Sequence, residues 1–186
     1  MKASVLRRMF AGLSALLFGL MLAGCGSPAS AQQSDQQKAV ALLNAGLAAH
    51  NAGRLAEASS DYRKVIALDP QNKWAHYNLG LIEQLAGQNA AAEADYRAAL
   101  AVEPNFVGAL YNLAILRTAA APDEAADLYR RAITVNPNLG SAHLNLGFLL
   151  ISLGKPGEGK AELDRAVAIE PALAQRIPKA PAATKK

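Results

Sequence analysis

Apolar residues recur along this chain three and four positions apart, in runs interrupted by short breaks rich in glycine, proline and polar residues. Leu79, Ile82 and Leu85 share one face of such a run, and Ala92 and Tyr96 share one face of the next run. This spacing predicts amphipathic α-helices that pack through their apolar faces. The small residues let neighbouring helices approach closely, and the larger side chains fill the space that remains.

The breaks divide the predicted helices into four pairs. Within each pair we expect a turn at a cluster of helix-breaking residues: Asn51-Ala52-Gly53, Gly87-Gln88-Asn89, Ala121-Pro122-Asp123 and Gly154-Lys155-Pro156. After each second helix comes a proline, which cannot continue the hydrogen bonds of a helix: Pro70, Pro104, Pro137 and Pro171. The pattern therefore predicts an all-α fold of four helical hairpins.

The four hairpins repeat one another. Their first helices each carry an asparagine in an apolar run, at intervals of 34, 34 and 33 residues: Asn44, Asn78, Asn112 and Asn145. Their second helices each carry a large residue eight positions before the proline: Tyr62, Tyr96, Tyr129 and Leu163. The third unit is one residue short, in its turn around residues 118–122, so the register of its helices is kept. A period of this length with paired helices is typical of an α-solenoid.

The repeated pattern resembles the tetratricopeptide repeat, with its Leu-Gly, small, aromatic, small and proline positions. Asn-Leu-Gly stands at residues 78–80 and 145–147, and residues 44–46 and 112–114 each differ from it by one residue. The resemblance covers about residues 37–173 and implies a right-handed solenoid of four helix-turn-helix units. The expected units are about 37–72, 73–106, 107–139 and 140–173.

The repeated asparagines suggest a binding face. Some tetratricopeptide repeats carry an asparagine ladder on their concave surface, where it grips the backbone of an extended peptide. The resemblance therefore implies peptide binding by Asn44, Asn78, Asn112 and Asn145, since an amide side chain both donates and accepts hydrogen bonds. The alternative is that each asparagine supports its own repeat by bonding a neighbouring backbone carbonyl.

Large apolar residues flank each asparagine. One position before it stand Leu43, Tyr77, Tyr111 and Leu144, and three positions after it stand Leu47, Leu81, Ile115 and Phe148. We expect part of this set, especially the second group, to lie in the core. Trp74, Tyr77 and Tyr111 are the predicted exposed anchors, because aromatic residues concentrate binding energy where they lose water. The lysines and arginines with which some family members clamp a terminal carboxylate are absent from this face.

The first 24 residues have the character of an export signal. Lys2, Arg7 and Arg8 form a basic segment, and an apolar segment follows from residue 10 to residue 23. That segment is shorter than the roughly 20 residues of a membrane-spanning helix. We interpret residues 1–24 as a signal peptide.

The segment ends in Leu-Ala-Gly-Cys at residues 22–25, which resembles the lipobox of bacterial lipoproteins. The resemblance implies that Cys25 is acylated, with chains such as palmitate, and anchors the protein to a membrane without spanning it. Cys25 is the single cysteine, so no internal disulfide can form. The alternative is cleavage after Ala31, at the small-x-small sequence of residues 29–31, which would release a soluble secreted or periplasmic protein.

The regions flanking the repeats are polar. We expect residues 25–36 to be a flexible tether, and residues 174–186 to form a short helical end followed by a disordered, basic tail of proline and alanine. Removal of the signal peptide takes away three cations and no acid, so the formal net charge falls from +4 to +1. That charge gives no indication of a nucleic-acid partner.

No catalytic or cofactor-binding motif is present in the sequence. His76 and His143 share one repeat position, and we expect them to pack between helices rather than to bind a metal. Acidic residues of the second helices, paired with nearby arginine or lysine, predict a solvated outer face. We therefore expect neither an enzyme nor a cofactor.

The predicted function is that of a lipid-anchored adaptor in the bacterial cell envelope, facing the periplasm, with the outer membrane favoured. Such an adaptor would bind an extended segment of a partner protein in assembly of pili, secretion pores or envelope-enzyme complexes. One alternative is a self-associating module, in which an uncapped last unit exposes Leu153 and Leu163 to a second copy. Another is a regulatory subunit of an envelope enzyme.

Overall fold

The computed structural model describes residues 28–178. Within this range it contains eight α-helices and one 3-10 helix, and no strand. The elements are α1 (Pro28–Asn51), α2 (Leu55–Leu68), α3 (Lys73–Leu85), α4 (Asn89–Val102), α5 (Val107–Arg117), α6 (Pro122–Val135), α7 (Gly140–Ser152), α8 (Pro156–Ile169) and η1 (Pro171–Arg176). The predicted all-α solenoid of helical hairpins is confirmed.

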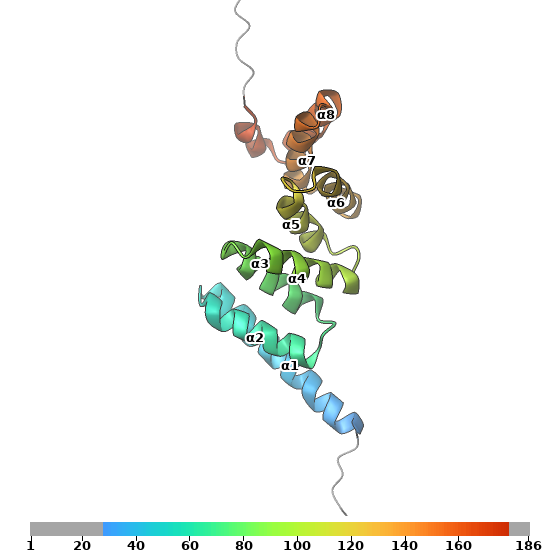
Figure 1. The fold of residues 1–186 in the computed structure, drawn as a ribbon. Helices are drawn as coiled ribbons and strands as arrows, with labels where there is room; N and C mark the ends of the chain where they lie inside the picture. Colours follow the sequence, from blue (N-terminus) through green and yellow to red (C-terminus); the bar gives the residue numbers. More distant parts are fainter. Residues whose placement is uncertain (1–27, 179–186) are drawn as a thin grey trace, which may run out of the picture.

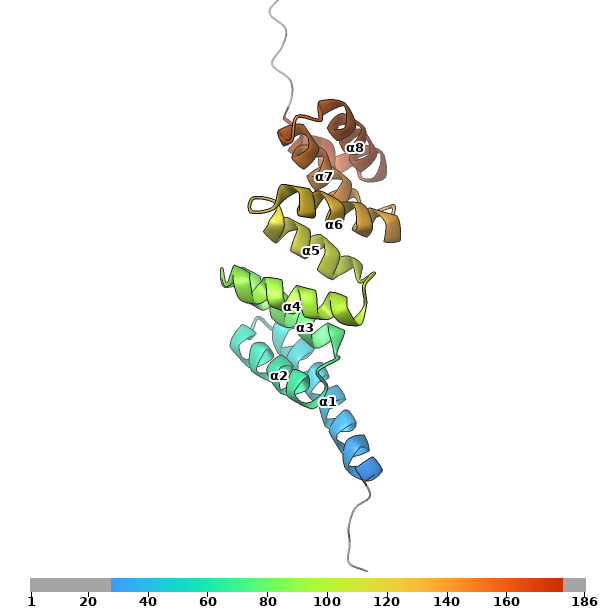
Figure 2. The same ribbon diagram turned by 45° about the vertical axis from the view of Figure 1, so that its right-hand side comes forward.

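Consecutive helices pack in pairs, α1 with α2, α3 with α4, α5 with α6 and α7 with α8. Each pair also packs on the next through α2 and α3, α4 and α5, and α6 and α7. The pairs stack into an elongated array with α1 at one end and α8 at the other (Figures 1 and 2). Because each pair contacts only its neighbours, the stability of every unit depends on the units beside it.

Each second helix ends two residues before the repeated proline. The residues directly before the prolines have left the helical conformation, with φ between −138° and −128° and ψ between 85° and 95°: Asp69, Glu103, Asn136 and Glu170. The proline ring disfavours the helical conformation in the residue that precedes it. The four prolines therefore set the length of the repeat.

Three of the four turns within pairs use a glycine in the left-handed region, where a side chain would be strained. Gly53, Gly87 and Gly154 have φ of 75°, 73° and 75°. The third turn, between α5 and α6, contains no glycine and is the one that lacks a residue. There the Thr118 hydroxyl donates to the Ala114 carbonyl at 2.8 Å and closes the end of α5.

Glycines on the first helices make room for the large residues of the second helices. A Cβ on Gly80 would lie 2.8 Å from the ring of Tyr96, and a Cβ on Gly147 would lie 2.8 Å from Leu163. The Tyr96 ring is fully buried as a result. The glycine of the first helix and the large residue of the second helix therefore form one contact in the first, second and fourth units, while the third unit has Ala114 at the glycine position.

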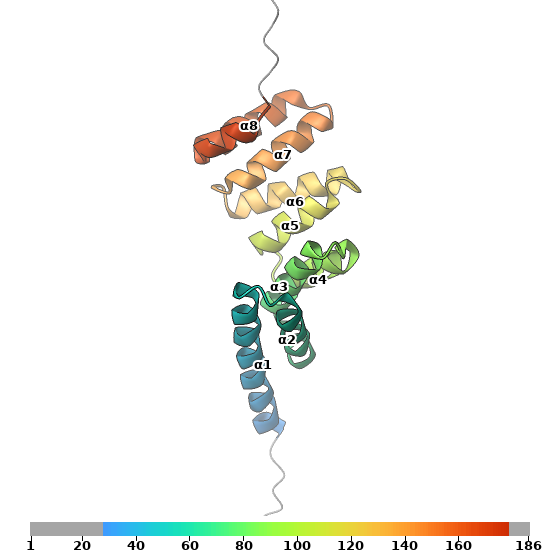
Figure 3. The same cartoon turned by 90° about the vertical axis from the view of Figure 1, so that its left-hand side faces the viewer.

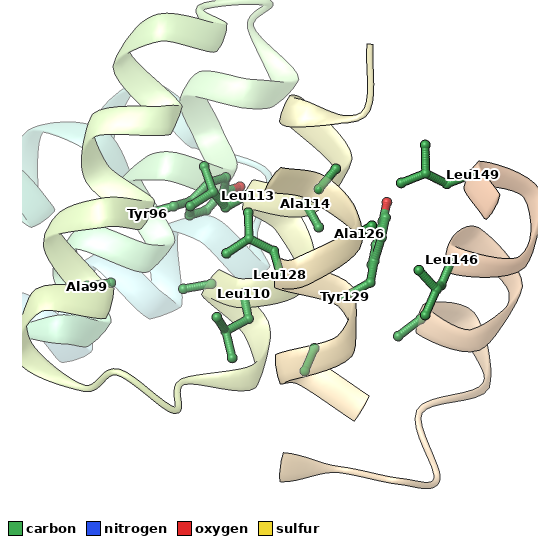
Figure 4. Packing of buried hydrophobic residues seen from close by; sticks show 14 of the residues in the cluster. Tyr96, Ala99, Leu110, Leu113, Ala114, Ala126, Leu128, Tyr129, Leu146 and Leu149 are labelled. Carbon is green, nitrogen blue, oxygen red and sulfur yellow. The ribbon is translucent and has the colours of Figure 1, made fainter. Parts of the chain in front are cut away.

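The main core runs without interruption from the second unit to the fourth. Figure 4 shows Tyr129 of α6 reaching toward Leu146 and Leu149 of α7, so an aromatic of one unit also packs against the next unit. Leu110 and Leu113 fill the same core from α5. Core residues of the second and third units therefore pack against the neighbouring unit as well as within their own hairpin.

The hydroxyls of the buried tyrosines are paired in two units out of three. The Tyr96 hydroxyl donates to Gln84 Oε1 at 2.7 Å, and the Tyr129 hydroxyl lies 3.4 Å from Thr118 Oγ1. The Tyr62 hydroxyl is buried and has no hydrogen-bond partner among the described residues. Burial of the Tyr62 hydroxyl therefore destabilises the first unit, since no hydrogen bond among the described residues replaces its bonds to water.

The expected tether is wrong for residues 28–36, which form the first turns of α1. These turns extend beyond α2 at one end of the array (Figure 3). Pro28 stands at the start of the helix, where its missing N–H costs nothing, and the alanines and glutamines that follow are good helix formers. The packed part of α1 supplies the nucleus, so its extension requires only propagation.

The expected uncapped end is also wrong. Leu163 is buried in a cluster with Leu144 and with Leu173 of η1, and Leu153 is half-buried. Leu173 packs against Gly140 at the start of α7, where a Cβ would lie 3.2 Å from its Cδ1 atom. The short 3-10 helix therefore covers the part of this apolar surface that Leu163 forms.

Several predictions concern residues outside the described range. The signal peptide, the lipidation site Cys25 and the basic tail beyond residue 178 are among them. No helix of the described part has the length and apolar character needed to cross a membrane.

Candidate functional site

Two asparagines of the ladder bond a tyrosine of the preceding unit. Asn112 Nδ2 donates to the Tyr77 hydroxyl at 3.3 Å, and Asn145 Nδ2 donates to the Tyr111 hydroxyl at 3.1 Å. Gly108 makes room for Tyr77, since a Cβ there would lie 2.9 Å from the phenolic oxygen. Burial raises the pKa of Tyr77, and the hydrogen bond from Asn112 opposes that rise. These bonds join the second unit to the third and the third unit to the fourth.

The other two asparagines have no such partner. Leu43 occupies the tyrosine position of the first unit, so Asn78 donates instead to the Trp74 carbonyl of its own helix at 2.8 Å. Asn78 is buried, whereas Asn44 has no preceding unit and is exposed. Asn78 thus has the role that the sequence left open as the alternative, in which an asparagine supports its own repeat by bonding a backbone carbonyl. The four asparagines are therefore not equivalent.

The residues three positions after the asparagines are more exposed than expected. Leu47 and Ile115 are each 36% exposed, and Leu81 and Phe148 are half-buried. The group does not lie inside the core as expected: Leu81 and Phe148 pack at the edge of core clusters, and Leu47 and Ile115 are exposed. Together with the asparagines, these residues form what we call the first-helix face, on α1, α3, α5 and α7.

The three predicted aromatic anchors differ in exposure. Trp74 is 48% exposed, and its ring packs edge-on against Phe106 with the ring centres 4.9 Å apart. The Lys73 ammonium lies 5.3 Å from the centre of the Trp74 ring. Tyr77 and Tyr111 are half-buried, and asparagines hold their hydroxyls. Trp74 is therefore an open contact surface, while the two tyrosines mainly join units.

A groove of about 810 Å³ lies on the first-helix face between the third and fourth units. Its walls include Tyr111, Ile115, Asn145, Phe148, Leu153 and Arg176. Arg176 belongs to η1, outside the repeated pattern, and sequence reasoning missed it as a groove residue. Its position depends on Leu173, whose packing on α7 has no counterpart in the earlier units.

His76 forms a clasp between the helices of the second unit. Its Nδ1 atom lies 2.8 Å from Asp95 Oδ1, and its Nε2 atom lies 3.0 Å from the Pro70 carbonyl oxygen. A carbonyl only accepts, so Nε2 carries a proton, and the carboxylate favours a second proton on Nδ1. The hydrogen bond with Asp95 raises the pKa of His76, although burial opposes the rise.

The fourth unit repeats this clasp. His143 Nδ1 lies 2.6 Å from Glu162 Oε2, and His143 Nε2 lies 3.0 Å from the Pro137 carbonyl oxygen. In the third unit the two corresponding positions hold Leu110 and Leu128, both buried. This pair of positions therefore holds either a histidine and a carboxylate or two leucines. This agrees with the predicted role of the histidines in helix packing.

Glu83 is a buried carboxyl between the first two units. Arg63 Nη2 lies 3.3 Å from Glu83 Oε1, and Glu83 Oε2 has no hydrogen-bond partner among the described residues. Burial raises the pKa of Glu83, the neighbouring Asp95 raises it further, and Arg63 opposes both. Glu83 is 6% exposed and is not among the residues that line the groove of the first-helix face.

The described residues offer no metal site, because no three histidine, cysteine, aspartate or glutamate side chains among them come together to hold an ion. The acidic residues of the second helices pair as expected. Arg117 bonds both Glu93 and Glu124, and Arg97 bonds the same two carboxylates. These charges form a partly exposed network on α4, α5 and α6 rather than a reactive site.

Sequence models of the tetratricopeptide repeat match residues 46–85, 75–106 and 116–177. No curated protein matches the sequence significantly. Among solved structures, MamA is similar over 79% of this chain and 86% of its own, with a TM-score of 0.67 and 22% identity. PilF of Pseudomonas aeruginosa is similar over 74% of this chain and 64% of its own, with a TM-score of 0.64 and 23% identity.

A third similar structure carries a ligand. It is the first tetratricopeptide repeat domain of Spaghetti (RPAP3), bound to the HSP90 peptide SRMEEVD. The similarity covers 63% of this chain and 94% of that domain, with a TM-score of 0.60 and 27% identity.

Proposed function

This chain belongs to the tetratricopeptide repeat family, and we propose that it is an adaptor whose first-helix face binds an extended segment of a partner protein. Tetratricopeptide repeats are protein-interaction modules, and the similar domain of Spaghetti (RPAP3) binds a peptide. The observation that carries the proposal is the groove of about 810 Å³ on this face, with half-exposed apolar residues along its course.

The contacts suit an extended segment better than a folded surface. Exposed or half-buried apolar side chains recur once per unit along the array, and Trp74 adds an aromatic surface in the second unit. An extended chain can place successive side chains on such points, while the Asn44 and Asn145 amides meet its backbone. Neutral hydrogen bonds contribute only about 0.5 to 1.5 kcal/mol each, so the apolar contacts must provide much of the affinity.

A crosslinking pull-down from the native membranes tests this proposal. The variant Trp74→Ala, Ile115→Ser removes apolar contacts from the first-helix face. The matched control Val102→Ser, Val135→Ser removes two similarly exposed apolar residues from α4 and α6. Partners that are lost with the first variant and kept with the control support the proposal. Partners kept by both folded variants would show that the first-helix face is not the binding surface.

The adaptor is also proposed to be anchored to a membrane of the bacterial envelope through a lipid on Cys25. The lipobox-like residues 22–25 support this, and so does the absence of any other cysteine in the sequence. The pathway would be one of pilus assembly, secretion or envelope-enzyme complexes, by resemblance to other lipoproteins with these repeats. Cys25→Ser should move the protein from the membrane fraction to the soluble fraction. A wild-type protein that is already soluble and begins at Gln32 would instead indicate cleavage after Ala31.

A further inference from the structure

We propose that the groove between the third and fourth units selects partner segments in which an acidic side chain, aspartate or glutamate, follows a large apolar one. Arg176 binds the carboxylate, and the apolar wall of the groove receives the neighbouring side chain. This inference rests on the proposed function, because it specifies which segments the first-helix face accepts.

The fold holds Arg176 at the groove. Leu173, three residues earlier, is buried against Gly140 of α7. Ile177, directly after Arg176, packs on the same cluster as Phe148. The backbone on both sides of Arg176 is therefore fixed to the fourth unit. Its position as a wall residue of the groove does not depend on a mobile end.

The charges around the groove favour an anion. Arg176 is the single charged residue among those that line the groove. Every other arginine between residues 28 and 178 bonds a carboxylate or a carbonyl of the chain: Arg54, Arg63, Arg97, Arg117, Arg130, Arg131 and Arg165. Arg176 is exposed and bonds no acceptor within the described residues. A carboxylate is the natural complement, because a guanidinium can donate two parallel hydrogen bonds to it.

The rest of the groove favours a large apolar residue next to the acidic residue of the bound segment. Ile115, Phe148 and Leu153 present apolar surface that is exposed or half-buried. Asn145 donates to the Tyr111 hydroxyl and also interacts with the Tyr129 hydroxyl, so its carbonyl oxygen is the group left for another partner. A volume of about 810 Å³ lies within the range of ordinary ligand sites and admits a short stretch of extended chain. The groove thus combines an apolar wall, one neutral amide and one cation.

Binding of three fluorescein-labelled peptides to the full chain in mild detergent tests the inference. Each peptide is acetylated and amidated, so that it has no terminal charge, and consists of glycine and serine around a central Leu-Phe-Asp, Leu-Phe-Asn or Leu-Phe-Lys. We expect the aspartate peptide to bind about two to five times more tightly than the asparagine peptide, as for an exposed ion pair. Arg176→Glu should reverse the order of the aspartate and lysine peptides, and Arg176→Gln should abolish the difference between them.

The matched control is Arg130→Glu, which makes the same charge change at an exposed arginine of α6 that does not line the groove. It should leave the order of the peptides unchanged. Equal binding of all three peptides to the wild type, unaltered by Arg176→Glu, would overturn the acidic preference while the general peptide-binding function stands. If no peptide binds the wild type, both the preference and the peptide-binding function are wrong.

Discussion

The amide of Asn145 donates to the hydroxyl of Tyr111 across the boundary between the third and fourth units, over 3.1 Å. Asn112 and Tyr77 make the same bond one unit earlier. In both cases the asparagine of one unit donates to a tyrosine of the preceding unit, and that tyrosine stands directly before the asparagine of its own unit. In this protein the ladder is partly a set of bonds between units, and only its remaining donors and acceptors are available to a ligand.

Tyr111→Phe is expected to lower the free energy of unfolding by about 0.5 to 1.5 kcal/mol, because Asn145 loses its acceptor while the ring remains. Urea unfolding followed by circular dichroism measures the change. Tyr62→Phe is the matched control, since the Tyr62 hydroxyl is buried without a partner among the described residues. Removal of this hydroxyl should leave the free energy of unfolding unchanged or raise it. Equal destabilisation by both substitutions would argue against a role for the bond between units.

Gly80→Ala is expected to destabilise the protein by about 1 to 3 kcal/mol, because the new Cβ would lie 2.8 Å from the buried ring of Tyr96. Gly157→Ala makes the same change in α8, at a site where nothing lies within 4 Å of the new Cβ. There the gain in helix propensity should stabilise by up to about 1 kcal/mol. Thermal melts of the two variants should therefore shift in opposite directions, and shifts of the same sign would contradict the close packing at Gly80.

The His76 clasp gives a pH dependence whose sign follows from its pKa. Asp95 raises the pKa of His76 above its unfolded value of about 6.5, so the folded state holds the proton more tightly. The stabilisation is complete below about pH 6.5 and is lost as the pH rises through the folded pKa. The variant His76→Leu, Asp95→Leu reproduces the Leu110 and Leu128 pair of the third unit and should remove this loss. Urea midpoints from about pH 6 to about pH 8.5 measure this loss of stability. If the midpoint of the variant falls with pH as much as that of the wild type, other groups cause the loss.

Glu83→Gln is expected to stabilise the protein at neutral pH. Burial raises the pKa of Glu83 above its ordinary value of 4.5, so folding disfavours the ionised carboxyl. The penalty is absent below about pH 4.5 and grows as the pH rises through the folded pKa. The neutral amide keeps a hydrogen-bond acceptor for Arg63, which lies 3.3 Å from Oε1. A lower urea midpoint for Glu83→Gln at pH 7 would mean that the ion pair with Arg63 outweighs the burial.

Leu173→Ala should open the end of the array. Deletion of a buried leucine side chain costs about 2 to 5 kcal/mol, and Leu173 is 6% exposed. Loss of this cap would expose the apolar cluster around Leu144 and Leu163. Static light scattering should then show association that increases with concentration, unlike the wild type. Leu85→Ala, at a side chain that is 72% exposed, is the control that should change neither stability nor mass.

The hairpins were predictable from the sequence because local chemistry decides them. A proline such as Pro104 stops a helix through the residue before it, and a glycine such as Gly80 marks the place where an aromatic ring fits. Both signals act at short range; the proline recurs in every unit, and the glycine in three of the four, with Ala114 in the third. The period of the sequence therefore fixed which helices pair.

The partners of the asparagines were not predictable in the same way, because they lie 34 and 35 positions apart. The signal was nevertheless present, since Tyr77 and Tyr111 each stand one unit before an asparagine and carry a hydroxyl that it can bond. Leu43 has the same position in the first unit but no hydroxyl. The contribution of η1 had no such signal. Leu173 and Arg176 occur once, so no repetition could indicate that one caps the array and the other enters the groove.

The helical start of α1 at Pro28 changes the mechanical relation between the repeats and the proposed lipid on Cys25. Only two residues separate that cysteine from the helix. The eleven residues of α1 that precede Ala39, the first residue that is buried among residues 33–178, add about 16 Å of helix at about 1.5 Å per residue. The start of α1 would then act as a strut that holds the repeats off the lipid surface, so the height of the groove above the membrane would be set by the length of a helix.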